Sequence, residues 1–449
     1  MLFSFQGLVN AADSSASICE VQMSIQKTSK SSERIVKAME EIDSQASLQC
    51  DSVRGSIPPK LFRRLKTKPR GFAEETIVSP GCSSSKEVEL ESSVWRNLPE
   101  ELVDRIMAWL PPIFFIRLQG VCKRWRDILN EHGFLRLLSQ LPTHGPCFLI
   151  TQKNGDIWHS AMYSHPMRQW HSLPLISTPK KAHSLIASAG GLLCFSALVG
   201  RHDELFICNP FRREYRQVPD MHHKRQLGFV NMFMDTKSRS YRIVAAGDYS
   251  YLGGNNRAFP TEVYDSKSNS WAIYDSVPVG ILHSSKSAFC NGRLYCLTSY
   301  PCGLVAFDVD RGLWESVPVR MPHSLLDAFL VAGEYGCLLL VGRTGLYSVH
   351  QSMRIWELNL QKMDWTEVGK MPHILFNGWL KSIAESFQCF GNGNCIFFAA
   401  QKYQKWLVYD LMKKCWYSFG GCPLISGSPG KSLKGIFFEP RLDTLVHQQ

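Results

Sequence analysis

Apolar positions in this chain follow two periods, a helical one confined to a short segment and a second one typical of strands. The helical segment begins abruptly at Trp95. A first helix is predicted from Pro99, which suits an initial helical turn, to the proline pair that begins at Pro111. Its apolar face has the spacing i, i+4, i+7, i+8 and consists of Leu102, Ile106, Trp109 and Leu110. Two further short helices are predicted on either side of Gly120.

The strand-like pattern occupies residues 139–449, where short apolar, β-branched and aromatic runs alternate with Gly, Pro, Asn and Asp. A unit repeats along this part: one strand ends at Asp or Asn, and an aromatic residue opens the next strand. Successive aromatic residues are 43 to 56 positions apart. They are Trp170, Tyr215, Trp271, Trp314, Trp365 and Trp416, with the weakest copies at the first two.

This spacing predicts a β-propeller, because a period of ~50 residues is that of a four-stranded blade, and the region is long enough for six. The alternative, a generic array of β-sandwiches, gives no reason for so regular an aromatic period. The first unit, from Cys147 to Pro174, is one strand short, whereas the tail 431–442 has one strand left over. We predict that this tail completes the first blade and closes the ring, which removes exposed sheet edges.

Residues 1–93 have a different composition, with 18 serines, 4 of the 51 aromatic residues and no tryptophan. Such a segment buries too little apolar area to offset its ordering entropy, so we predict that it is mostly disordered. The apolar residues within 35–42 are spaced as on one face of a helix, which fits either a short amphipathic helix or a transient helix without a partner. Residues 54–70 carry seven basic and no acidic side chains, as in a nuclear-import signal or a solvated basic linker.

Charge and cysteine content exclude several classes of function. Of the net charge of +11, +9 is spread along residues 139–449 rather than gathered in a basic arm, so no direct binding of nucleic acid is expected. No stretch approaches the ~20 apolar residues of a membrane-spanning helix, so no membrane partner is expected either. The 15 cysteines include no C-x-x-C pair, which favours reduced, buried thiols in a cytosolic or nuclear protein.

The chain also lacks convincing motifs for catalysis or metal binding. Gly430, Lys431 and Ser432 resemble the end of a phosphate-binding loop, but Ile425 stands where that loop requires glycine. The pair His222-His223 has no third ligand or carboxylate at a usable spacing, so a surface turn is favoured over a metal site. We therefore expect no catalytic residue, no cofactor and no metal.

The helical segment has more apolar and aromatic side chains than three short helices can bury. Each buried Leu or Ile is worth about 1.5–3 kcal/mol, so several exposed ones would be costly. Either a partner protein covers them, with Trp and Leu as anchors, or they pack on the C-terminal domain of the same chain.

The segment resembles an F-box in Asn97-Leu98-Pro99-Glu100-Glu101-Leu102, Leu110-Pro111, Val121-Cys122-Lys123 and Trp125-Arg126. This resemblance implies docking to a Skp-type adaptor, which links an F-box protein to a cullin scaffold in a ubiquitin ligase. The adaptor-facing residues that it implies are Leu98, Pro99, Leu102, Ile106, Leu110, Leu118, Val121, Cys122 and Trp125.

The runs LLCF, at 192–195, and ICNPFRREYRQVP, at 207–219, are similar to the kelch-type half of plant F-box proteins. The resemblance departs from the pattern at the double glycine, which is clear only at Gly190-Gly191. The expected organisation is a multidomain chain: a disordered tail (1–93), a small all-α F-box of three helices (94–138) and an all-β kelch-type propeller of about six blades (139–449).

The resemblance implies a substrate-recognition subunit of an SCF (Skp-cullin-F-box) ubiquitin ligase in the nucleus and cytoplasm. Such a subunit is not an enzyme itself, and its propeller binds a target protein through loops such as the one at 253–257. The alternative is a non-degradative scaffold or transcriptional co-regulator that uses the same two docking surfaces.

Overall fold

The structure is a computed structural model. It describes residues 99–145, 147–175, 178–235, 238–247, 260–277, 282–298, 302–346, 349–380, 387–400, 406–420, 422–425 and 434–447. All of these belong to one compact unit, Glu89–Gln449. The predicted disordered tail, the helical spacing at 35–42, the basic segment 54–70, the loop 253–257 and the glycine-rich stretch 426–433 lie outside the described residues.

The described part of the chain begins with helices. They are α4 (Glu100–Ala108), α5 (Pro112–Leu118), α6 (Lys123–Asp127), the 3-10 turn η1 (Ile128–Asn130) and α7 (His132–Gln140). Helix α4 has Glu100 and Glu101 in its first turn, where carboxylates complement the helix dipole. Pro112 opens α5 after the chain turns at Pro111. The three predicted helices are present, and α7 is an additional one.

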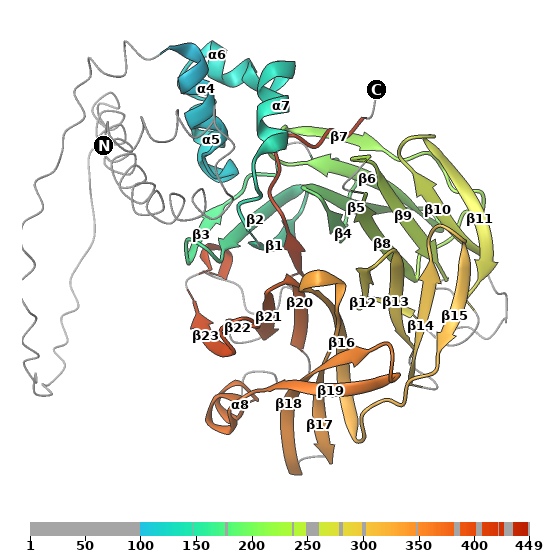
Figure 1. The fold of residues 1–449 in the computed structure, drawn as a ribbon. Helices are drawn as coiled ribbons and strands as arrows, with labels where there is room; N and C mark the ends of the chain where they lie inside the picture. The colour runs from blue at the N-terminus through green and yellow to red at the C-terminus, as the bar shows by residue number, and fades with distance from the viewer. Residues whose placement is uncertain are drawn as a thin grey trace, which may run out of the picture. The chain divides into compact units, whose positions relative to one another are not determined.

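Strands follow, and they form four-stranded antiparallel blades around a ring (Figure 1). Blade 1 consists of β24 (Lys434–Phe438), β1 (Cys147–Asn154), β2 (Ile157–Ser164) and β3 (Gln169–Ser172). Blade 2 consists of β4 (Ser184–Ala189), β5 (Leu192–Val199), β6 (His202–Asn209) and β7 (Glu214–Gln217). Blade 3 consists of β8 (Phe229–Met234), β9 (Tyr241–Ala246), β10 (Pro260–Asp265) and β11 (Ser270–Ser276).

The other three blades have the same order of strands. Blade 4 consists of β12 (Leu282–Cys290), β13 (Arg293–Thr298), β14 (Gly303–Asp308) and β15 (Leu313–Val317). Blade 5 consists of β16 (Leu325–Gly333), β17 (Leu338–Leu346), β18 (Val349–Asn359) and β19 (Asp364–Lys370). Blade 6 consists of β20 (Phe387–Gly393), β21 (Cys395–Ala400), β22 (Trp406–Asp410) and β23 (Cys415–Phe419), and helix α8 (His373–Leu380) precedes it.

The ring closes by the predicted exchange of strands. Strand β24, from the end of the chain, pairs antiparallel with β1, so that Phe438 lies opposite Cys147 and Lys434 opposite Thr151. The prediction that the tail completes the first blade is therefore confirmed, and so is the six-bladed propeller. Strands β16 and β20 also pair, in parallel, which joins blades 5 and 6 into one sheet.

The repeated Asp or Asn makes the same turn in successive blades. Its side-chain oxygen accepts a hydrogen bond from a backbone N–H two or three residues further on, which stabilises the turn before the outer strand. The five acceptors are Asn209, Asp265, Asp308, Asn359 and Asp410, and they bond to the N–H groups of Phe211, Lys267, Arg311, Gln361 and Met412 at 2.8–3.1 Å.

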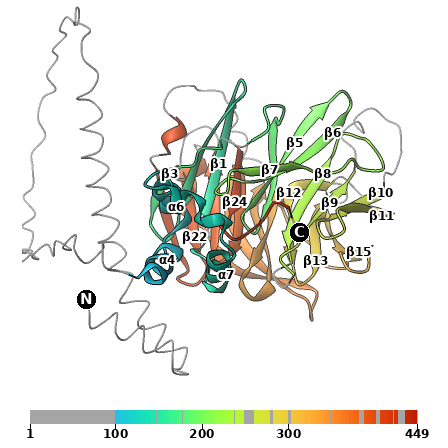
Figure 2. The ribbon, with the colours of Figure 1, turned by 90° about the horizontal axis from the view of Figure 1, so that it is seen from above.

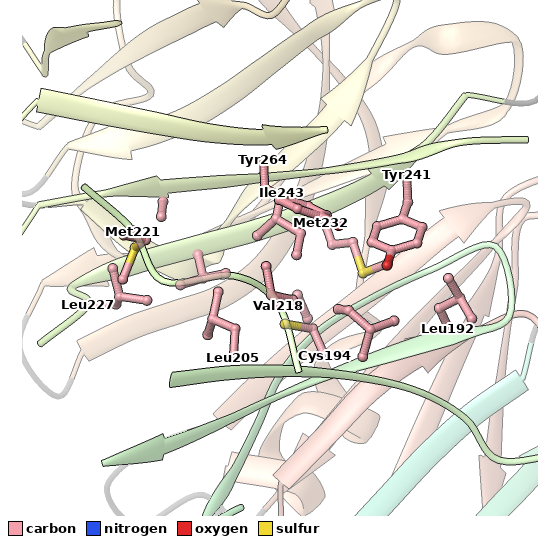
Figure 3. Packing of buried hydrophobic residues seen from close by; sticks show 14 of the residues in the cluster. Leu192, Cys194, Leu205, Val218, Met221, Leu227, Met232, Tyr241, Ile243 and Tyr264 are labelled. Carbon is pink, nitrogen blue, oxygen red and sulfur yellow. The ribbon is translucent and has the colours of Figure 1, made fainter. Parts of the chain in front are cut away.

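The aromatic residue after that turn reaches the preceding blade. Trp271 Nε1 donates to the carbonyl of Pro219 at 2.7 Å, and Trp314 Nε1 donates to Thr261 Oγ1 at 2.8 Å. Trp170 of blade 1 makes the equivalent hydrogen bond to blade 6, where the ring closes: its Nε1 donates to the carbonyl of Gly420 at 2.9 Å. Between blades 2 and 3 the gap is filled by a buried apolar cluster, part of which Figure 3 shows. Tyr215 differs, because half of its side chain is exposed.

The propeller has two unlike faces. The chain enters β1 and leaves β24 on one face, which also holds the Asx turns; we call it the helix face. The β1–β2 and β5–β6 turns and the connections between blades lie on the opposite face, which we call the loop face. Seen edge-on in Figure 2, α7 and the C-terminus lie toward one edge of the wheel, and the tips of the β1–β2 and β5–β6 hairpins lie toward the other.

Candidate functional site

The helices before the propeller have an inner side that is buried. Phe115 is fully buried and stacks on Phe134 of α7, with ring centroids 5.8 Å apart. Phe114 lies edge-on to His171 of blade 1 at 5.9 Å. The buried side chains of this inner side are Met107, Ile113, Phe114, Phe115, Leu118, Ile128, Leu129 and Phe134. The inner side thus forms a small core of its own that also contacts the propeller.

The outer side of these helices exposes apolar side chains. Trp109 is 48% exposed and Val121 is 64% exposed. Among the residues implied by the F-box resemblance, Pro99, Val121 and Cys122 are exposed, Leu102, Ile106, Leu110 and Trp125 are half-buried, and Leu118 is buried. Leu98 lies outside the described residues. We call the exposed and half-buried members, together with Trp109, the outer apolar side.

Trp109 is a member that the motif did not supply. Helical spacing alone predicts that Trp109 lies on this side, because it shares the apolar face of the first helix with Leu102 and Ile106. The structure leaves it open to solvent at the C-terminal end of α4. The chain itself therefore buries the inner side of these helices, whereas on the outer side Trp109 and Val121 are exposed.

Polar side-chain contacts cap the start of α6 and tie it to α4. The Cys122 sulfur, at the N-cap of α6, accepts a hydrogen bond from the N–H of Trp125 at 3.4 Å. Arg124 Nη2 lies 2.7 Å from Asp104 Oδ1, so that α6 is tied to α4. Asp127, at the end of α6, is bonded to Arg126, which lowers the pKa of its carboxyl. The ion pair between Arg124 and Asp104 thus holds α6, which carries Trp125, against α4.

Arg212 joins the helices to the propeller. Its guanidinium donates to the carbonyls of Leu129, at 3.0 Å, and of Leu442 in the C-terminal tail, at 3.4 Å. It also forms an ion pair with Glu214 at 3.0 Å, and its side chain is only 6% exposed. The Asx turn at Asn209 positions Arg212. The helices, the tail and blade 2 therefore meet at one buried cation.

The histidine pair has a carboxylate partner that sequence spacing did not reveal. Glu262 of β10 is fully buried and accepts hydrogen bonds from the backbone N–H groups of His222, at 2.8 Å, and His223, at 3.1 Å. Its main charge partner is the guanidinium of Arg225, at 2.7 Å. Sequence spacing did not reveal this partner, because Glu262 lies about 40 positions away along the chain. The described residues contain no group that could hold a metal ion.

Comparison with known proteins supports both parts of this arrangement. The F-box domain model matches residues 95–137, and the model of the KIB1-4 β-propeller matches residues 162–416, more than half of the chain. The chain belongs to the F-box proteins that carry a KIB1-4 β-propeller. Its F-box implies binding of a Skp-type adaptor, and F-box proteins are typically non-catalytic subunits of SCF ubiquitin ligases.

Plant F-box proteins are similar to this chain over most of their length. F-box only protein 6 of Arabidopsis thaliana is 27% identical, over 86% of this chain and 83% of that protein. Protein UNUSUAL FLORAL ORGANS, also of Arabidopsis thaliana, is 26% identical, over 80% and 87%. Protein ABERRANT PANICLE ORGANIZATION 1 of Oryza sativa is 28% identical, over 82% and 93%. Two Arabidopsis thaliana relatives named F-box/kelch-repeat proteins are 24% and 26% identical.

The described helices include none with the length and apolar character needed to cross a membrane.

Proposed function

We propose that this F-box protein is the substrate-recognition subunit of an SCF ubiquitin ligase. Its F-box helices dock the Skp-type adaptor and, through it, the cullin, while the propeller binds the protein to be ubiquitinated. The observation that supports this most is the outer apolar side, which the chain leaves uncovered although it buries the opposite side of the same helices. We infer that Leu98, Pro99, Leu102, Ile106, Leu110, Val121, Cys122 and Trp125 contact the adaptor, and that Leu118, which is buried, supports them.

The role in catalysis would be positional. A bound target is held near the ubiquitin-conjugating enzyme, so its lysines react at a high effective concentration without any covalent step on this chain. Arg212 contributes by fixing the F-box helices to blade 2 and the tail. We infer action in the nucleus and cytoplasm, in keeping with the basic segment 54–70.

The proposal is tested by a double variant on the outer apolar side, Ile106→Ser with Trp125→Ser. Each change removes a large apolar contact at the centre of the inferred interface, so we expect affinity for the purified Skp-type adaptor to fall by at least about 100-fold. The matched control is Leu360→Ser with Ile374→Ser, two exposed apolar residues of the propeller, which should leave affinity unchanged.

Turnover of a partner then separates degradation from scaffolding. If the protein recruits targets for ubiquitination, partners bound by the propeller become longer-lived in cells that carry the Ile106→Ser/Trp125→Ser variant. If their lifetimes stay the same although adaptor binding is lost, the non-degradative scaffold or co-regulator is correct. Undiminished adaptor binding by the double variant would refute the docking surface itself.

A further inference from the structure

Two neighbouring hairpin tips on the loop face present apolar side chains to solvent. The β1–β2 tip carries Ile157, which is 64% exposed, and the β5–β6 tip carries Leu198 and Val199, which are 50% and 37% exposed. Gathered exposed apolar residues beside charged ones are typical of an interaction site rather than of an inert surface. We call these three residues, with the cations Lys153, Lys180 and Arg201 around them, the hairpin patch.

The two hairpins are fixed to one another. The ring of Trp158, in β2, lies edge-on to Phe195 of β5, with centroids 5.1 Å apart. Lys153 Nζ donates to the carbonyls of Lys180, at 3.0 Å, and Ala182, at 2.5 Å, both in the connection between blades 1 and 2. A partner would therefore meet a preformed surface and lose little free energy in ordering it.

The β5–β6 hairpin is also held in place by contacts with the connection between blades 1 and 2. The N–H of Leu198 donates to Nδ1 of His183, at 3.1 Å. Lys181 forms an ion pair with Glu204 at 2.6 Å, and Glu204 also accepts from the amide of Gln217. Since Lys181 is neutralised by Glu204, it adds little net charge to the patch.

The other cations of the patch give it a positive charge. Within the described residues, no carboxylate lies within ion-pair distance of Lys153, Lys180 or Arg201, and Lys180 and Arg201 are exposed. Two acids lie near these cations: Asp156 is exposed in the β1–β2 turn, and Asp203 stands opposite Leu198, where its half-buried carboxylate accepts a hydrogen bond from the N–H of Leu227. A surface of this sign attracts acidic groups and repels basic ones, which provides selectivity as well as faster association.

We propose that the hairpin patch binds an acidic segment of a target protein that also carries aliphatic side chains. The aliphatic side chains pack on Ile157, Leu198 and Val199, and the carboxylates pair with Lys180 and Arg201. This inference rests on the proposed function, since the segment would belong to the protein that the propeller recruits. The loop face lies opposite the face at which the chain enters from the F-box helices, so a bound segment leaves the outer apolar side free for the adaptor.

The test uses the purified full chain without adaptor and a display library of random 12-residue peptides. We expect selection to enrich peptides in which Asp or Glu stands beside Leu, Ile or Val. A synthetic copy of the most enriched peptide should bind Lys180→Glu/Arg201→Glu at least about tenfold more weakly than the unchanged chain, because attraction becomes repulsion. Ile157→Ser/Leu198→Ser should weaken binding by a similar factor.

The matched control is Lys267→Glu/Lys362→Glu, which makes the same change of charge at two exposed turns of the helix face. It should bind the peptide as the unchanged chain does. Enriched peptides without acidic residues, no enrichment, or equal binding by the patch variants would overturn the proposal. A 20-base-pair DNA duplex is the second probe: if it binds and the patch variants abolish that binding while peptides fail, the patch serves nucleic acid instead.

Adaptor affinity is measured on the same variants. Both patch variants should retain it, since their substitutions lie outside the F-box helices. Loss of peptide binding with intact adaptor binding supports the hairpin patch, whereas failure of the unchanged chain to bind adaptor would refute the proposed ligase function and leave the peptide result standing.

Discussion

The propeller and the F-box helices treat their apolar surfaces differently. In the propeller, β24 returns from the end of the chain to pair with β1, and aromatic residues of the outer strands fill the gaps between blades. In the F-box helices, Phe115 and its neighbours are buried, but Trp109 and Val121 are not. The propeller thus buries its apolar surface against itself, whereas the helices leave apolar side chains exposed on one side, which is the side that we propose binds the adaptor.

The largest effect should come from opening the ring. Deleting residues 434–447 removes the inner strand of blade 1. It also removes the tail whose Leu442 carbonyl accepts a hydrogen bond from Arg212. We expect the melting temperature in calorimetry to fall by more than about 10 °C, or the chain to become insoluble, because the edge of β1 and the adjacent core are exposed. Truncation after residue 447 is the control. An unchanged melting temperature for the longer deletion would mean that the ring does not need β24.

The next largest effect should be a difference in stability between substitutions on the inner and the outer side of the F-box helices. Phe115→Ala empties a fully buried site, so urea unfolding should show a loss of about 3–5 kcal/mol. Leu102→Ala, on the outer side, should cost less than about 1 kcal/mol in stability but weaken adaptor binding. If Leu102→Ala destabilised the free chain as much as Phe115→Ala, the two sides of the helices would not differ as described.

The gaps between blades offer a comparison inside the propeller. Trp271→Ala removes a buried ring and its hydrogen bond to Pro219, and we expect a loss of about 3–5 kcal/mol. Tyr215→Ala affects a ring that is half exposed, so its cost should stay below about 1 kcal/mol. Equal losses in urea unfolding would show that Tyr215 fills its gap as the tryptophans do.

The smallest predicted effect is a difference in the rate at which buried and exposed cysteines are alkylated. Burial raises the pKa of Cys147 and Cys395 to about 12 and that of Cys422 to about 11, so these thiols stay protonated at pH 8 and should react slowly with iodoacetamide. Among the thiols of the described residues, the exposed Cys122 and Cys302 should react first, as mass spectrometry of the labelled sites would show. Added adaptor should protect Cys122 and leave Cys302 reactive. Rapid labelling of Cys395 would contradict the closed propeller.

The sequence predicted the features that have a local period. The Asx turns, the outer-strand aromatic residues and the spare strand at 434–438 are each visible within one repeat, so six blades and their closure could be inferred. Arg212 and Glu262 were missed because their partners are far away in sequence: Leu129 and Leu442 for the first, His222 and Arg225 for the second. Burial of Leu118 was missed for a related reason, since apolar spacing alone does not say which side of a helix meets the rest of the chain.

The central claim is that the outer apolar side is open to water until an adaptor covers it, and side-chain oxidation by hydroxyl radicals measures this directly. In the free full-length chain, Trp109 and Trp125 should be oxidised readily, whereas the buried Phe115 and Phe134 should not. With a saturating amount of purified Skp-type adaptor, we predict that both tryptophans become protected. The account is contradicted if they are already protected in the free chain, or if they remain as reactive when the adaptor is bound.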